Sequence, residues 1–148
     1  MKIQQATKRY ERLVLVVGAS GSGKTALLEE AKQRTGAPLI NINLELSKGM
    51  LELTELQRKL YVKDLVDEII SAATDQLVLL DELDLLFDSS LEIDPLALLR
   101  SLSRRFTVVA AWNGFVKDGY LFYGIVGHPD YRRLQLRNDF VIDLVPTA

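Results

Sequence analysis

A glycine-rich loop set between an apolar strand and a helix constrains this chain more than any other feature. Residues 13–17, LVLVV, form an apolar run that ends at Gly18 and predicts a strand buried on both faces. The loop GASGSGKT occupies residues 18–25, and apolar residues at helical spacing follow over Lys24 to Arg34. The segment matches G-x-x-x-x-G-K-[ST] in full, with the strand and the helix that flank this pattern in phosphate-binding loops.

Each residue type in the loop suits a bound phosphate. Glycine lets the backbone turn so that successive N–H groups point at phosphate oxygens, and the helix N-terminus adds its dipole. We expect Lys24 to bind the β- and γ-phosphates and the Thr25 hydroxyl to bind Mg²⁺. The alternative is a Gly/Ser-rich turn that only enters a helix. The residues predicted to bind the nucleotide are Gly18, Ala19, Ser20, Gly21, Ser22, Gly23, Lys24 and Thr25.

Short apolar runs alternate with helical stretches along the rest of the chain. Such alternation predicts an α/β fold with three layers, in which helices cover both faces of a mostly parallel, five-stranded sheet. The length of 148 residues fits one domain, residues 1–148. The further predicted strands are Pro38–Leu44, Leu77–Leu80, Phe106–Trp112 and Phe140–Val145, and the further helices are Thr54–Ala73 and Asp94–Arg104. The glycines of residues 113–129 predict a hairpin or a long loop.

An acidic pair follows the third predicted strand. Asp81 and Glu82 come directly after the run LVLL, at the edge where the phosphate-binding loop is also expected. Asp81 fits a Mg²⁺ role, and Glu82 fits the base that polarises an attacking water. A solvated acidic strand end is the alternative. Asp84 is a competing acid, for which we expect a role as a helix cap or a surface charge.

Composition narrows the function classes. The chain has no cysteine, which excludes disulfides, thiolate metal sites and a cysteine nucleophile. A net charge of -2 offers no global basic field for nucleic acid, although a local basic patch remains open. No apolar run approaches the ~20 residues of a membrane span, and the first residues lack a signal-peptide cleavage pattern. We therefore expect a cytoplasmic protein without membrane contact.

The loop and the acidic pair together resemble the P-loop ATPases with an extra catalytic glutamate, the group that includes AAA+ and STAND proteins. The resemblance implies a polar sensor at Asn113, which ends FTVVAAWN; an asparagine at a strand-to-loop turn is the alternative. It also implies an arginine finger near the helix before the last strand, where Arg132 and Arg133 match best. Proteins of this group continue into a helical lid, and because the sequence ends at Ala148, we expect a core that lacks it.

Several longer stretches resemble one small family, that of BrxF, the short P-loop protein of type 3 BREX bacteriophage-defence systems. The segments that carry this likeness are VVGASGSGKTALL, INLELSKGMLELTELQRK, VLLDELDLLFDSSLEIDPLALLRSLSRRFTVVAAWNG and GHPDYRR. The resemblance implies a bacterial ATPase-like protein that works with other phage-defence proteins.

These observations predict Mg²⁺-dependent binding of ATP, and slow hydrolysis whose output is a conformational change. Two alternatives remain open. One is a nucleotide-gated scaffold that binds ATP without turnover. The other is a small-molecule kinase, which would need an arginine-bearing lid, whereas the insertion after the fourth strand offers only Lys117. The sequence leaves open whether copies of the chain assemble with one another.

Overall fold

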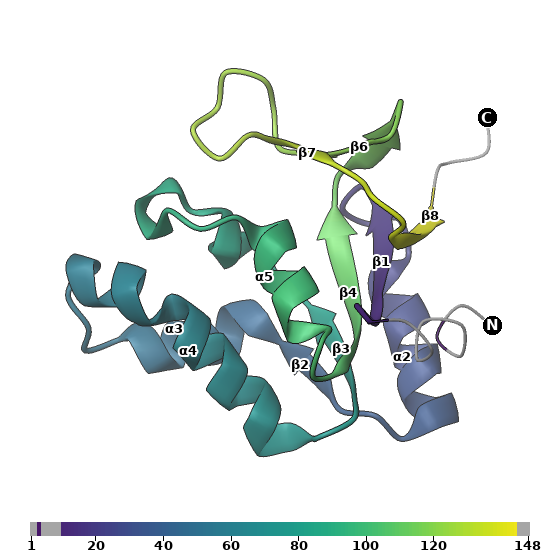
Figure 1. The fold of residues 1–148 in the computed structure, drawn as a ribbon, viewed down its shortest axis with the longest axis horizontal. Coiled ribbons are helices and arrows are strands. Elements are labelled where there is room, and N and C mark those ends of the chain that lie inside the picture. The colour runs from purple at the N-terminus through teal and green to yellow at the C-terminus, as the bar shows by residue number, and fades with distance from the viewer. Residues whose placement is uncertain (1–2, 4–9, 145–148) are drawn as a thin grey trace.

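Five parallel strands form the central sheet, in the order β2-β3-β4-β1-β8 (Figure 1). The computed structural model describes residue 3 and residues 10–144. The strands are β1 (Leu13–Gly18), β2 (Leu39–Asn41), β3 (Leu77–Asp81), β4 (Thr107–Asn113) and β8 (Phe140–Asp143). The predicted parallel, five-stranded α/β sheet is therefore confirmed. Val145, the last residue of the predicted fifth strand, lies outside the described residues, as does Ala148, so the expectation about a lid stays a prediction.

Helices cover the sheet on both faces because the central strands are apolar on both faces. In β1 the side chains of Leu13, Leu15 and Val17 join the larger core cluster, whereas those of Val14 and Val16 join the smaller one. Helix α2 (Lys24–Thr35) packs on the smaller cluster. Helices α3 (Ile42–Met50), α4 (Glu55–Ala73) and α5 (Pro95–Leu102) pack on the larger one, with the short 3-10 helices η1 (Asp84–Phe87) and η2 (Ser89–Leu91).

The predicted helix starts are confirmed by their caps. Helix α4 begins after Thr54, whose side chain accepts from the Gln57 N–H while the Gln57 side chain accepts from the Thr54 N–H. Helix α5 begins after Asp94, whose carboxylate accepts from the Ala97 N–H, with Pro95 in the first turn. Both caps satisfy backbone donors that have no partner inside the helix, and the one at Thr54 is reciprocal.

The predicted second strand is too long, and a helix takes its second half. Strand β2 ends at Asn41, and α3 begins at Ile42. The Asn41 side chain accepts from the Leu44 N–H at 3.0 Å, which caps the helix. Ile42, Leu46 and Met50 are then buried at four-residue spacing, so the helix covers the sheet with one apolar stripe.

A second, three-stranded antiparallel sheet lies beyond the carboxyl end of β4 (Figure 1). Its strands are β5 (Phe115–Lys117), β6 (Tyr120–Tyr123) and β7 (Arg132–Gln135). The hairpin predicted among the glycines of residues 113–129 is β5–β6. The prediction of a helix that carries Arg132 and Arg133 is wrong. Residues 132–135 form strand β7, which pairs with β6, and their side chains alternate between partly buried and exposed.

Buried aromatic side chains fix this small sheet to the domain. Trp112 is fully buried, and its Nε1–H donates to the Phe122 carbonyl at 3.1 Å. The Tyr123 ring stacks on Phe87 of η1, with ring centroids 3.5 Å apart. The small sheet is therefore held firmly against β4 and η1.

A buried ion pair fixes the chain between β7 and β8. The guanidinium of Arg100 in α5 donates from Nε to Asp139 Oδ1 at 3.2 Å and from a terminal nitrogen to Asp139 Oδ2 at 2.7 Å. The side chains are only 10% and 6% exposed. Burial tends to raise the pKa of Asp139, but hydrogen bonds from Arg100 and the Arg137 N–H, with the charges of both arginines, outweigh it and lower that pKa.

No helix among residues 3 and 10–144 has both the length and the apolar composition needed to cross a membrane.

Candidate nucleotide site

The glycine-rich loop joins β1 to α2 with the geometry that its sequence predicts. Gly21 and Gly23 have φ values of 79° and 100°, in the left-handed region that favours glycine. A Cβ atom at Gly18 would lie 2.3 Å from Ser22 Oγ, so a larger residue there would displace the loop. The loop therefore depends on glycine for both its turn and its tight packing.

Lys24 points back into the loop that precedes it. Its ammonium donates to the carbonyl oxygens of Gly18 at 2.9 Å and Ala19 at 2.6 Å, and it lies 3.4 Å from Ser22 Oγ. The residue is only 6% exposed. Burial lowers the pKa of Lys24, and the negative charges of Asp81, Asp84 and Glu82 oppose that shift. A buried cation thus stands at the base of the predicted phosphate site.

Thr25 and Asp81 meet, although they are 56 residues apart in the sequence. The Thr25 hydroxyl donates to Asp81 Oδ2 at 2.8 Å. The other carboxylate oxygen, Oδ1, accepts from the Glu82 N–H at 2.9 Å. The Asp81 carboxylate is therefore held at a fixed position at the start of α2.

Glu82 occupies a strained backbone conformation. Its φ is 54°, which costs free energy for a residue with a Cβ. The left-handed turn ends β3 at Asp81 and lets the exposed Glu82 side chain stand at the strand edge next to Asp81. The turn after β3 is thus made by this one residue.

Asn113 ends β4, next to Gly18 at the end of β1. Its side-chain amide donates to both oxygens of Asp84 at 3.2 Å. Asp84 also accepts from the Tyr123 hydroxyl, and the pKa of that phenol is raised by burial first and then by the Asp84 charge and hydrogen bond. The predicted cap role of Asp84 is wrong, because the residue lies inside η1, which has no side-chain cap, and its carboxylate instead positions the amide of Asn113.

The loop, the acidic pair and Asn113 line one cavity at the carboxyl ends of β1, β3 and β4. Parallel sheets bind ligands at this edge. Of the predicted nucleotide-site residues, those lining it are Ser20, Gly21, Gly23, Lys24, Thr25, Asp81, Glu82 and Asn113. Asp84 lines it too, and its contact with Asn113 is a feature that sequence reasoning missed. No pattern of sequence spacing links two residues that are 29 positions apart. The contact between Asp84 and Asn113 becomes evident only from the structure, in which β3 and β4 pair in parallel.

Oxygen ligands at this edge fit Mg²⁺. A hydroxyl and a carboxylate converge at Thr25 and Asp81, with Glu82 beside them. Oxygen ligands are the ones that Mg²⁺ prefers, and it commonly binds through one or two protein groups, waters and substrate phosphates. The donor set therefore matches a small divalent cation bound together with a phosphate.

The two arginines predicted as fingers lie in β7, outside this cavity. Arg132 donates to the carbonyl oxygens of Tyr131 at 3.2 Å and Phe87 at 3.4 Å. The Arg133 guanidinium lies 4.0 Å from the centre of the Tyr120 ring. Neither side chain contacts the predicted phosphate site of its own molecule, so a finger role would require a second molecule.

The chain has been compared with known proteins. No curated protein matches it. A structure of PCH-2 from C. elegans is similar over 76% of this chain and 34% of that chain, with 20% sequence identity and a TM-score of 0.41. The chain thus spans about a third of the length of that protein. The model of the ATPase family associated with various cellular activities (AAA) matches residues 14–114. Because that match covers more than half of the chain, this protein belongs to the AAA family of ATPases.

Proposed function

We propose that this protein binds ATP together with Mg²⁺ and hydrolyses it. The contact between the Thr25 hydroxyl and Asp81 Oδ2, at 2.8 Å, carries the proposal. It joins the end of the phosphate-binding loop to the carboxylate after β3, as a shared metal site requires. A Gly/Ser-rich turn that only enters a helix would need no such partner.

The remaining side chains take roles around the γ-phosphate. Lys24 supplies positive charge to the β- and γ-phosphates, and the loop N–H groups bind their oxygens. Thr25 and Asp81 would hold Mg²⁺, which when bound would neutralise the charge that develops on those phosphates. Glu82 accepts a proton from the attacking water, and the Asn113 amide orients that water. The products are ADP and inorganic phosphate.

Replacing Lys24 tests the site. Calorimetry should show that Lys24→Ala weakens ATP binding by about tenfold to a hundredfold, because a charge-assisted contact is lost. Lys32→Ala, an exposed lysine on the same helix, is the matched control and should bind ATP like the parent. Equal affinity of Lys24→Ala and the parent, with both folded, would refute the phosphate site.

Phosphate release in the absence of any acceptor molecule separates the three candidate functions. The proposed ATPase releases phosphate from ATP and water alone. A scaffold binds ATP in calorimetry but releases no phosphate. A small-molecule kinase releases phosphate only slowly without an acceptor and transfers it when one is added.

The biological setting that we propose is a bacterial phage-defence complex in the cytoplasm. The support is the likeness to the BrxF family in segments outside the phosphate-binding loop, above all LELS, AAWNG and GHPDYRR. Nucleotide binding would order or release the segments that follow Asn113, and so change contacts with other defence proteins. Plaque counts on cells with the complete defence system should rise when Lys24→Ala replaces the parent, and equal counts for Lys24→Ala and parent would reject this setting.

A second copy of the chain could supply the missing arginine. Arg132 and Arg133 lie outside the cavity of their own molecule, and an arginine finger in trans raises rates by about 10³–10⁵. We therefore expect specific activity to rise with protein concentration and light scattering to show ATP-dependent assembly. A concentration-independent rate that Arg132→Ala and Arg133→Ala leave unchanged would exclude a finger from β7.

A further inference from the structure

The outer face of the β5–β6–β7 sheet is a second candidate site, distinct from the nucleotide cavity. Side chains of a strand alternate between its two faces, and the register aligns Val116, Leu121 and Leu134 on the inner one. Leu121 is fully buried, and the other two pack on the core. The outer face therefore carries two rows across the strands, which are Phe115–Phe122–Arg133 and Lys117–Tyr120–Gln135.

Three aromatic rings gather on this outer face. Phe115 and Phe122 stack with ring centroids 4.7 Å apart and an interplanar angle of 9°. Phe115 is nevertheless 50% exposed, which is high for a phenylalanine in a strand. Tyr120 stands in the adjacent row, two residues before Phe122 at the start of β6. Contiguous exposed apolar groups, rather than single ones, mark contacts with other molecules, and Phe115 and Phe122 are contiguous on this face.

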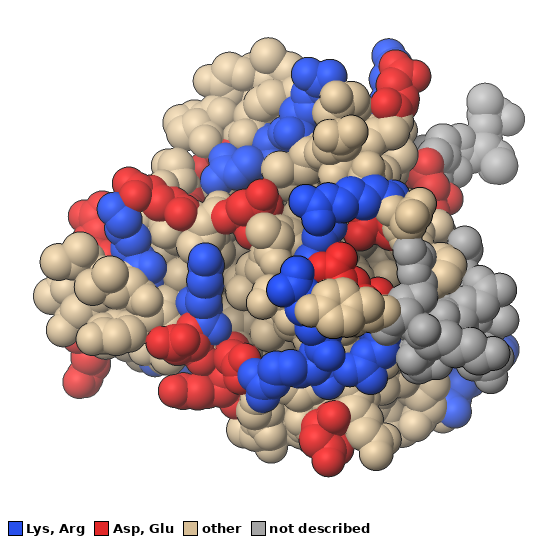
Figure 2. Space-filling model, in the orientation of Figure 1, with Lys and Arg blue, Asp and Glu red and all other residues tan. Residues whose placement is uncertain are grey.

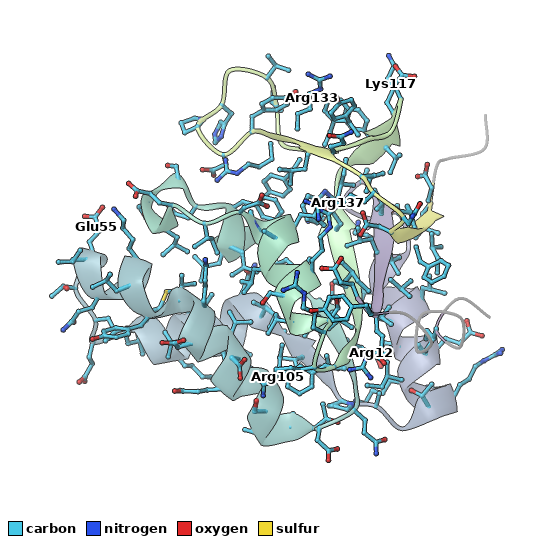
Figure 3. The ribbon with its side chains drawn as sticks, viewed as in Figure 1. Arg12, Glu55, Arg105, Lys117, Arg133 and Arg137 are labelled. Atoms are coloured by element: carbon cyan, nitrogen blue, oxygen red, sulfur yellow. The ribbon has the colours of Figure 1, made fainter. Side chains whose placement is uncertain are left out.

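Cations stand among these rings. The Arg133 guanidinium lies over the Tyr120 ring, 4.0 Å from its centre, and this cation–π contact leaves its N–H donors available. Lys117 is exposed on β5, and Figure 3 shows both side chains at the small sheet, pointing away from the central one. Within the described part of the chain, neither Lys117 nor Arg133 is in an ion pair.

The local charge is opposite to that of the whole protein. The two outer-face rows hold two cations, Lys117 and Arg133, and no carboxylate, and Asp118 follows Lys117 in the turn. The net charge of the chain is -2. Figure 2 shows lysine and arginine side chains recurring from the small sheet down the middle of this face of the molecule. An anionic partner is therefore favoured at this sheet.

We propose that the outer face of β5–β6–β7 binds single-stranded nucleic acid. Bases stack on exposed aromatic rings, and phosphates pair with the cations beside them, so a partner needs both flat rings and regular negative charge. A duplex hides its bases, and an acidic peptide lacks the stacking rings. The fixed Arg133 on Tyr120 and the half-exposed Phe115 supply both kinds of contact on one rigid surface.

Fluorescence anisotropy of a labelled oligothymidine tests the proposal. The parent protein should bind at low salt in the absence of nucleotide, because this face lies outside the nucleotide cavity. Phe115→Ala should weaken binding by about tenfold through loss of one stacked base. Lys117→Ala should lower the slope of log affinity against log salt by about 0.7, the value for one phosphate contact on a single strand.

Matched variants on α4 control for general effects of surface substitution. Tyr61 is 47% exposed and Lys63 is exposed, so Tyr61→Ala and Lys63→Ala remove the same kinds of group from another face. Both should bind the oligonucleotide like the parent. An oligoribonucleotide measured in parallel distinguishes RNA from DNA as the source of the strand.

Three results would overturn the proposal. In the first, neither single strand binds at low salt. In the second, a duplex of the same sequence binds more tightly than the single strand. In the third, the α4 variants lose as much affinity for the oligonucleotide as the small-sheet variants do. Circular dichroism checks that each variant is folded at the assay temperature, because Phe115→Ala also removes the ring that stacks on Phe122.

Discussion

The side-chain amide of Asn113 donates to both carboxylate oxygens of Asp84, at 3.2 Å each. A carboxylate only accepts hydrogen bonds, so this contact fixes the amide with its nitrogen toward Asp84. The carbonyl oxygen of Asn113 is then left as an acceptor. An acceptor at the end of β4 suits a water that must be oriented for attack on a phosphate.

Replacing Asp84 should therefore slow hydrolysis without weakening ATP binding. In Asp84→Asn the charge that holds the Asn113 amide is lost, and we expect turnover to fall by about tenfold while the ATP affinity stays unchanged. Phosphate release and calorimetry measure the two quantities. Asp88→Asn, which removes a nearby carboxylate that accepts from Ser90 outside the cavity, is the control. Parent-like turnover in Asp84→Asn would show that Asp84 does not position Asn113 for the reaction.

Glu82→Gln should retain ATP binding and lose turnover. The amide keeps the shape of the side chain but cannot take a proton from water. Asp81→Asn is the informative comparison, because it should instead reduce the contribution of Mg²⁺ to the affinity for ATP. Titration of ATP with and without Mg²⁺, followed by phosphate release, separates the two variants. If Glu82→Gln hydrolyses ATP like the parent, the base is another residue, and Asp84 becomes the candidate.

The sequence predicts most of the central sheet because the physical signals there are local. Apolar runs flanked by glycine or acidic residues mark β1, β3 and β4, since strands buried on both faces need such runs. The loop pattern predicts the turn between β1 and α2. Two helix starts are also predicted from local signals, which are apolar spacing from Thr54 onward and an N-cap residue, Asp94, before Pro95.

The elements that were predicted wrongly carry patterns that fit two structures. Residues 40–44, ININL, alternate as a strand does, yet Asn41 caps a helix whose stripe of Ile42, Leu46 and Met50 is seen only over nine residues. Residues 132–135 were assigned to a helix by family likeness, although RRLQ alternates as a strand. The contact of Asp84 with Asn113 depends on the pairing of β3 with β4 and has no sequence signal.

The strained turn at Glu82 makes a prediction about stability. Glu82 has a φ of 54°, which glycine adopts freely and alanine does not. Both Glu82→Gly and Glu82→Ala remove the carboxylate, so the difference between their free energies of unfolding reports the cost of the backbone conformation. The glycine variant should be more stable by about 1 kcal/mol. Urea unfolding measures it. At Glu68, inside α4, the order should reverse, with glycine less stable than alanine by about 1 kcal/mol. The same order at both sites would contradict a left-handed Glu82.

The buried pair of Arg100 and Asp139 should make stability depend on acidic pH. The folded protein lowers the pKa of Asp139 below its ordinary value of 3.8. The unfolded chain therefore takes up the proton more readily, so the stabilisation is complete above that value and is lost as the pH falls through the folded pKa. Asp139→Asn leaves the guanidinium of Arg100 buried without its counter-charge and should cost about 3 kcal/mol at neutral pH. Urea unfolding at neutral and at acidic pH measures the cost, and the difference between parent and variant should shrink in acid.

Glu45→Gln breaks an exposed pair with Lys48 and should cost less than about 1 kcal/mol. A parent-to-variant difference at Asp139 that stays constant with pH would show that the carboxylate does not stabilise the fold through its charge.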